Sequence, residues 1–348
     1  KIVPREAVEE LGDLRDGIPI GTGPWQWMNG IKAIAYNLER NPNYYEEGLP
    51  RIDRLGFQVI PDARTRFAAL LLGTLDVAEI PPSEVTTITK KYPGMELLEV
   101  PHYGHGVEMV INTGDPAFED LKIRQAVFQA LDPWRYLETV WQGGIFTGLG
   151  MPLVSNEWLL PLEDLRTYWG DYDEAMELLH GAPLSLLNPF DVTVADYGDA
   201  HLDLAEVVLQ DLKAVGFDAR IRQVNPVQYV DQVWGVGDYA IYLGPQISVA
   251  KPNDYFLGIL HSAGGLNNTH YRNIDLDQLL EEQAVAFDPL KRRQLVLDIQ
   301  RRLLRSAVRF ALVTDVSSWA WQPRIKDLHL NLAGYEYFYH ARIGLRAD

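Results

Sequence analysis

The chain has 348 residues, of which 47% are hydrophobic and 23% charged, with a formal net charge of −17 and no cysteine. This length predicts two domains, because one hydrophobic core rarely grows beyond roughly 250–300 residues. The negative charge argues against nucleic acid and anionic membranes as partners, and the lack of cysteine excludes thiolate nucleophiles, cysteine-based zinc sites and disulfides.

Strand-like and helix-like patterns alternate along the chain. The predicted strands are Ala33–Arg40, Leu55–Ile60, Val107–Ile111 and Ala219–Val224. The predicted helices follow the cap residue Asp62, span Leu121–Leu131, span Leu202–Leu212 ahead of Gly216, and follow the cap and first-turn proline at Asp288-Pro289. This alternation predicts a mixed α/β protein.

No motif points to catalysis, a cofactor or a metal. Gly21-Thr22-Gly23 resembles the start of a phosphate loop, but Pro24 removes a backbone N–H that such a loop needs, so we interpret it as a turn. His102 and His105 lie three residues apart, which on a strand places them on opposite faces. No Gly-x-Ser-x-Gly elbow occurs. We therefore predict that the protein is not an enzyme and holds neither cofactor nor metal.

Aromatic residues are numerous, with nine Trp, 17 Tyr and 11 Phe. Several of them lie outside periodic core faces, namely Tyr103, Trp134, Trp141, Phe146, Tyr255, Trp319 and Trp321. Such rings either complete the packing of a core or form the walls of a ligand site. The sequence pattern leaves both interpretations open for each ring.

Five groups of short segments follow one another across nearly the whole chain. They are Gly21-Thr22-Gly23-Pro24-Trp25 with Leu38–Tyr45, Val59–Arg66 with Leu72–Asp76, Ile111-Asn112-Thr113 with Phe118–Ala126, Asn267–Tyr271 with Asp275–Asp277, and Asp288-Pro289 with Arg292-Arg293. In this order they resemble the family 5 extracellular solute-binding proteins, the group that binds oligopeptides, dipeptides and nickel.

The resemblance implies an α/β, type II periplasmic-binding-protein fold, in which two lobes joined by crossing strands close over a ligand. Residues 1–112 with 317–348 are then the remainder of the first lobe, and residues 113–316 form the second lobe. The chain is expected to cross near Asn112–Asp115 and to return near Val313–Ser318. Because the family's Gly-Thr-Gly-Pro motif already occurs at residue 21, the family's N-terminal part is expected to be lacking. Arg124 is expected to belong to a packing motif.

The resemblance also indicates the ligand-binding segment. Peptide-binding members hold the ligand's amino terminus with an aspartate whose position falls at Val249 here, and the nearby Gln246 and Ser248 are uncharged. A buried ammonium without a carboxylate costs several kcal/mol, so a neutral oligosaccharide or a blocked peptide competes with a free-amine peptide. If the loop is shifted by a few residues, Asp254 takes the place of that aspartate and restores its negative charge. The predicted ligand-binding residues are Tyr103, His105, Trp141, Phe146, Gln246, Ser248, Asp254, Tyr255 and Trp319.

The function implied is the substrate-binding component of an ABC importer. We expect an extracytoplasmic monomer that captures a small solute of the peptide or oligosaccharide class and delivers it to the importer's membrane subunits. One alternative is an extracytoplasmic hydrolase of oligosaccharide or peptide. Another is a sensor or chaperone-like relative that binds a protein partner.

Overall fold

The computed structural model describes residues 4–12, 20–31, 34–81, 84–141, 151, 158–182, 189–246, 252–329 and 337–345. The chain forms two compact units, residues 1–100 with 317–348 and residues 101–316. The second division lies between residues 316 and 317. The first falls inside strand β5 (Glu96–Ile111), ahead of the expected lobe boundary at residue 112. Strands β5 and β9 (Arg309–Trp321) each contribute residues to both units.

The first unit contains a three-stranded antiparallel sheet and a small helical layer. The sheet has the order β1-β2-β3, with Trp25 opposite Arg40 and Leu38 opposite Leu55. A core of Leu70, Ala78, Ile80, Ile88 and Ala320 joins helices α2 and α3 to strands β4 and β9. The bounds are α1 Arg5–Leu11, β1 Trp25–Ile31, β2 Ala35–Arg40, β3 Arg54–Gln58, α2 Ala63–Leu71, β4 Val77–Ile80, α3 Val85–Lys91, β10 Ile325–Lys326, the 3-10 helix η8 Tyr337–Arg342 and β11 Gly344–Leu345.

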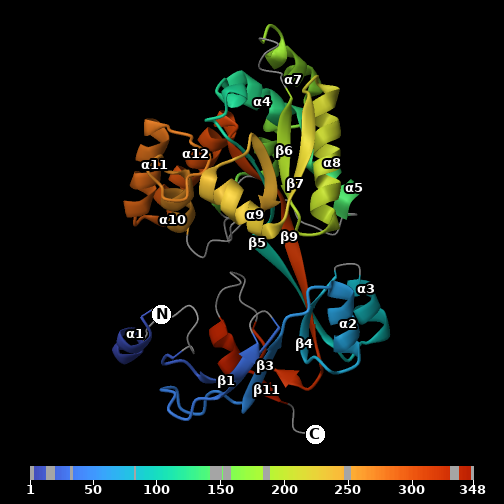
Figure 1. Ribbon diagram of the computed structural model, residues 1–348, viewed down its shortest axis with the longest axis vertical. Coiled ribbons are helices and arrows are strands. Elements are labelled where there is room, and N and C mark those ends of the chain that lie inside the picture. Colours follow the sequence, from blue (N-terminus) through green and yellow to red (C-terminus); the bar gives the residue numbers. More distant parts are fainter. Residues whose placement is uncertain are drawn as a thin grey trace. The chain divides into compact units, whose positions relative to one another are not determined.

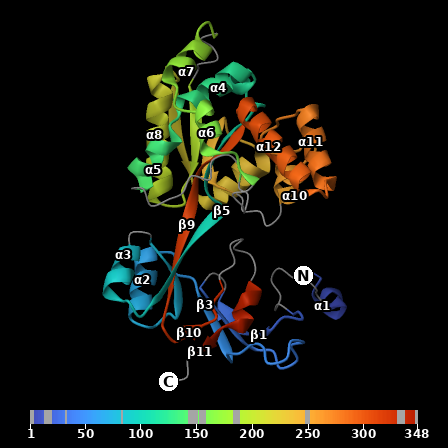
Figure 2. The same ribbon diagram turned by 180° about the vertical axis from the view of Figure 1, so that it is seen from behind.

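The second unit is built on a sheet whose strands follow the order β9-β5-β8-β6-β7. Strand β6 runs parallel to β7 and β8, and β5 runs antiparallel to β8. Figures 1 and 2 show α8 alongside β6 and β7, with α5 next to it, and α11 and α12 at the opposite side of this unit. The strands here are β6 Phe190–Ala195, β7 Ala219–Val224 and β8 Ile241–Pro245.

The helices of the second unit surround this sheet. They are the 3-10 helix η2 Pro116–Phe118, α4 Leu121–Ala130, α5 Pro133–Trp141, α6 Leu162–Leu165, the 3-10 helix η4 Arg166–Tyr168, α7 Tyr172–Leu179, α8 Asp199–Ala214, α9 Pro226–Gln228, the π-helix η6 Tyr229–Val236, α10 Pro252–Tyr255, the π-helix η7 Phe256–Leu260, α11 Ile274–Val285 and α12 Pro289–Ser306. No helix in the described part of the chain is both long and apolar enough to cross a bilayer.

The predicted elements are present, and their caps act as expected. The Asp62 side chain accepts a hydrogen bond from Thr65 N at the start of α2, and Asp288 accepts from Leu290 N and Lys291 N at the start of α12. The predicted strands correspond to β2, β3, β5 and β7, and the predicted helices to α2, α4, α8 and α12. The segment from Gly21 to Pro24 consists of bends, as the turn interpretation requires.

Arg124 is buried and makes structural hydrogen bonds, in line with the packing role that the family resemblance implies. It is 5% exposed. Its Nε donates to the carbonyl of Ser306 (3.1 Å), and its Nη1 donates to the carbonyls of Phe118 and Glu119 (both 2.8 Å). One guanidinium therefore ties α4 to the end of α12 and to the turn that precedes α4.

We expect Arg124→Ala to lower the free energy of unfolding by about 2 kcal/mol, because it leaves buried carbonyl groups without donors. Ligand affinity of the folded protein should stay nearly unchanged. Thermal unfolding followed by calorimetric titration at a temperature where both proteins are folded measures the two quantities separately. Loss of binding at unchanged stability would contradict the structural role.

Candidate ligand-binding site

Gln246 directly follows strand β8 in the second unit. Its backbone N–H donates to the carbonyl of Gly106 on β5 (2.9 Å), and its side chain is buried. Neither its Oε1 nor its Nε2 has a hydrogen-bond partner among the described residues. A buried carboxamide normally uses both groups, so within the described part of the chain Gln246 has a donor and an acceptor without a partner.

Two of the predicted ligand-binding residues, Tyr103 and His105, lie on the part of β5 that is next to Gln246. Val107 pairs with Pro245, and both Tyr103 and His105 lie on β5 a few residues before Gly106. The backbone of this predicted wall therefore adjoins Gln246. The side chains of Tyr103 and His105 lie outside the described part, so their contact with a ligand stays a prediction.

A buried ion pair joins Glu108 on β5 to Arg309 on the neighbouring strand β9. Arg309 Nη1 is 3.9 Å from Glu108 Oε2, and both side chains are almost completely buried, at 1% and 2% exposed. Tyr242 on β8 donates its hydroxyl proton to Glu108 Oε1 (2.6 Å) and accepts from Arg309 Nη2 (3.2 Å). The same nitrogen donates to Asn268 Oδ1 (2.6 Å). This cluster of Glu108, Arg309, Tyr242 and Asn268 is called the buried polar cluster below.

The alternation of the strands places this cluster and Gln246 on one face. Met109, Ile111 and Leu243 belong to the main core on the other face, whereas Tyr242 packs with Tyr229 and Val233. Side chains two residues apart on an extended strand lie on the same face, so Gln246, directly after β8, lies on the same side as Tyr242. Gly244 lets the Tyr229 ring pack against the strand, since a Cβ at this position would lie 2.7 Å from that ring.

Burial sets the electrostatics of the cluster. Desolvation raises the pKa of Glu108, although the nearby Arg309 guanidinium and the Tyr242 hydroxyl act to lower it. Desolvation likewise raises the pKa of Tyr242 well above its usual value. The Arg309 guanidinium stays charged and lies 5.3 Å from the centre of the Trp234 ring, a cation–π contact. Arg309 thus links β9 to β5, to β8 and to the loop carrying Asn268.

The other predicted ligand-binding residues are distributed more widely. Tyr255 is fully buried in the apolar cluster between η7, α11 and α12, where it also interacts with Arg309 of the buried polar cluster. Asp254 is exposed on α10. Trp141 ends α5 and packs against the main core. Trp319 belongs to the first unit, where it is opposite Glu79. Phe146 and Ser248 lie outside the described residues. No observation brings these residues to one ligand, so their roles remain predictions.

Sequence reasoning missed the buried polar cluster. A signal was available, because Glu108 interrupts the apolar run Val107–Ile111 and Arg309 interrupts the run Val308–Val313. A charge of each sign inside two buried strands is expected to have a partner. The sequence does not reveal that these two charges are partners, because they are 201 positions apart (309 minus 108).

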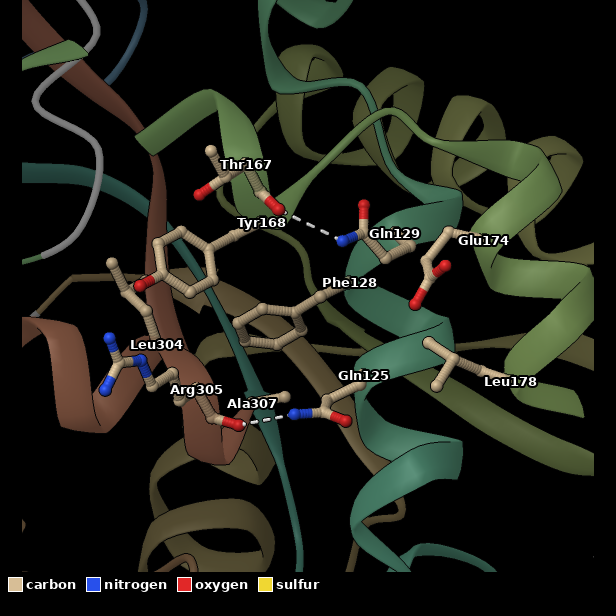
Figure 3. A pocket seen from close by; sticks show the side chains of 10 residues that line it. All are labelled: Gln125, Phe128, Gln129, Thr167, Tyr168, Glu174, Leu178, Leu304, Arg305 and Ala307. Atoms are coloured by element: carbon tan, nitrogen blue, oxygen red, sulfur yellow. Dashed lines mark hydrogen bonds between the residues drawn. The ribbon is translucent and has the colours of Figure 1, made fainter. Parts of the chain in front are cut away.

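A separate pocket of about 200 Å³ lies between α4, η4, α7 and the end of α12 (Figure 3). The amide nitrogens of Gln125 and Gln129 already donate to the carbonyls of Arg305 and Thr167. No predicted ligand-binding residue with a described side chain lines it. Among the described residues, no three His, Asp or Glu side chains are grouped so as to hold a metal ion.

The fold is that of the type II periplasmic binding proteins. The structure of the oligopeptide-binding protein AppA from Bacillus subtilis, in complex with a nonapeptide, matches with a TM-score of 0.82 at 20% identity, over 99% of this chain and 72% of that chain. Residues 2–268 match the family described as bacterial extracellular solute-binding proteins, family 5 Middle. The chain belongs to this family.

Two curated relatives resemble the chain over most of its length. The probable di/tripeptide-binding protein 5 of Pseudomonas aeruginosa (strain UCBPP-PA14) is 24% identical, over 92% of this chain and 61% of the relative. Heme-binding protein A of Haemophilus influenzae is 27% identical, over 93% of this chain and 60% of the relative. The chain therefore spans about three-fifths of the length of these relatives.

Proposed function

We propose that this chain is the ligand-binding part of the substrate-binding component of an ABC importer, acting outside the cytoplasm together with the importer's membrane subunits. Membership of the solute-binding family and the fold support this function. The names of the relatives span di/tripeptides and heme, and the AppA structure holds a nonapeptide. Family membership alone therefore leaves the ligand class open, and the residues of this chain have to distinguish between the classes.

Gln246 is the observation that carries the proposal. Leaving a buried polar group unpaired costs about 1–3 kcal/mol, and Gln246 leaves two such atoms unpaired among the described residues. A ligand that both donates and accepts hydrogen bonds would satisfy them. Gln246 also lies in the segment that forms a ligand wall in the family the chain resembles.

The charge at this segment favours a neutral ligand group. The position that matches the family's amine-binding aspartate is Val249, and the nearest carboxylate that follows, Asp254, is exposed on α10. A desolvated ammonium requires a carboxylate partner. We therefore propose a neutral oligosaccharide or an N-blocked peptide, in preference to a peptide with a free amino terminus.

Calorimetric titration of the full-length protein would test the ligand class, with a free-amine peptide, the same peptide acetylated at its N-terminus, and neutral oligosaccharides compared. Tight binding is expected in the acetylated-peptide or oligosaccharide arm. Tight binding of ordinary peptides that Asp254→Asn abolishes would show that Asp254 binds the amino terminus in place of the family's aspartate. The neutral-ligand proposal would then be wrong.

A Gln246→Met variant tests the residue itself. Ligand affinity is expected to fall about tenfold, while the ligand-free protein becomes more stable by about 1 kcal/mol because two unpaired polar atoms are removed. Gln223→Met is the matched control, since Gln223 is exposed on β7. A Gln246 variant that loses stability and keeps its affinity would show that the carboxamide is structural.

The hydrolase alternative makes a different prediction. A binding protein returns its ligand unchanged after prolonged incubation, whereas a hydrolase would release shorter products. Mass spectrometry of a ligand carried by the purified full-length protein distinguishes the two functions, and loss of turnover on mutating a pair of carboxylates would establish the hydrolase.

A further inference from the structure

A second pocket, of about 610 Å³, lies in the second unit beside α12. Among the residues that the structure describes, its lining includes four arginines, Arg124, Arg301, Arg302 and Arg305, and one carboxylate residue, Asp298. This is a concentration of positive charge in a chain whose formal net charge is −17. None of the predicted solute-binding residues whose side chains the structure describes lines this pocket.

Two of the four guanidiniums already have carboxylate partners. Arg301 pairs with Asp298 (3.1 Å) and with Asp164 (3.5 Å), and Arg302 pairs with Asp275 (3.0 Å). All of these side chains are at least 34% exposed. Exposed ion pairs contribute little to stability and are readily exchanged, so their remaining N–H donors can turn towards a bound anion.

The other two guanidiniums form no ion pair with a carboxylate among the described residues, although Asp120 lies close enough to Arg124 to act on its charge. The Nε and Nη1 donors of Arg124 are used by backbone carbonyls, which satisfy hydrogen bonds without cancelling the positive charge. The exposed Arg305 side chain has no ion-pair partner in the described part of the chain. The lining thus combines a buried cation, Arg124, with an exposed one, Arg305.

We propose that this pocket binds a small oxyanion of the phosphate class that carries two or more negative charges. Phosphate oxygens accept paired hydrogen bonds from the planar fork of a guanidinium, and several forks around one pocket fit an anion with several oxygens. Tyr271 adds a hydroxyl group to the same lining. The site is separate from Gln246 and does not depend on the proposed transport function.

Titration of the full-length protein with inorganic pyrophosphate by calorimetry would test the site. Saturable binding is expected, and Arg305→Gln is expected to weaken it at least about tenfold, because a charged hydrogen-bonding group is lost. Arg302→Gln should weaken it as well. Lys291→Gln is the control: it removes the same charge from the same helix, and Lys291 pairs with Glu282 without lining the pocket.

Three outcomes would overturn the proposal. One is the absence of saturable binding at moderate ionic strength. Another is an equal loss of affinity in Lys291→Gln and Arg305→Gln, which would indicate diffuse attraction to the helix. The third is adherence to vesicles of anionic phospholipid without binding of free pyrophosphate. Arg124 is left unchanged throughout because it holds α4 in place.

Discussion

Replacing Arg309 with methionine is expected to lower the free energy of unfolding by about 3–5 kcal/mol, the range for breaking a buried ion pair by removing one partner. The change leaves Glu108 in an apolar environment without its cation, and it takes a donor from Tyr242 and Asn268. Urea unfolding followed by tryptophan fluorescence measures the loss as a lower midpoint. Because Arg309 joins three strands, the loss should appear in the whole second unit.

The double variant Glu108→Gln with Arg309→Met distinguishes the ion pair from simple packing. It removes both charges, so it should recover a large part of the lost stability. Arg324→Met is a matched control, since its ion pair with Asp76 is about half exposed and is worth less than about 1 kcal/mol. A loss of less than about 1 kcal/mol in Arg309→Met would show that water or a neutral carboxyl already compensates the guanidinium, contrary to the ion pair described above.

Acidification is expected to destabilise the protein through His201 on α8. Burial lowers the pKa of His201 from 6.5 to about 4, with Asp196 opposing the shift, and the His201 Nε2 has no hydrogen-bond partner among the described residues. The folded-state pKa lies below the unfolded-state value, so between pH 6.5 and 4 the unfolded chain binds a proton that the folded chain excludes. The contribution of His201 to stability is therefore fully present above pH 6.5 and is lost as the pH falls towards 4.

A shift of this size corresponds to about 2–3 kcal/mol, after some reduction because the side chain is partly accessible. His201→Leu should therefore lose less stability than the parent protein between pH 7 and pH 4, measured by urea unfolding at each pH. The exposed His180 provides the control variant, His180→Leu, which should keep the parent's pH dependence. Identical pH profiles for His201→Leu and the parent would show that folding does not shift the pKa of His201.

The sequence alone was sufficient for the features that depend on neighbouring residues. Asp62 and Asp288 cap α2 and α12 because a side-chain oxygen reaches backbone N–H groups two or three positions ahead. The helical spacing of Leu202, Ala205, Leu209 and Leu212 predicts α8, and the resemblance carried the fold class and the packing role of Arg124. The predicted roles of Tyr103, His105 and Trp319 in ligand binding remain open.

Only the tertiary structure revealed the features that depend on groups far apart in the chain. Glu108 and Arg309 become partners because the sheet order β9-β5-β8 brings their strands together, and no local pattern contains that order. That the Gln246 carboxamide has no partner among the described residues depends on the groups around it, which the residue type alone does not determine. The arginine pocket likewise requires α4 and α12 to meet, although more than 170 positions separate Arg124 from Arg301 (301 minus 124 is 177). Local hydrogen bonds and periodicity are encoded by nearby residues, whereas burial and charge pairing arise only when the chain has folded.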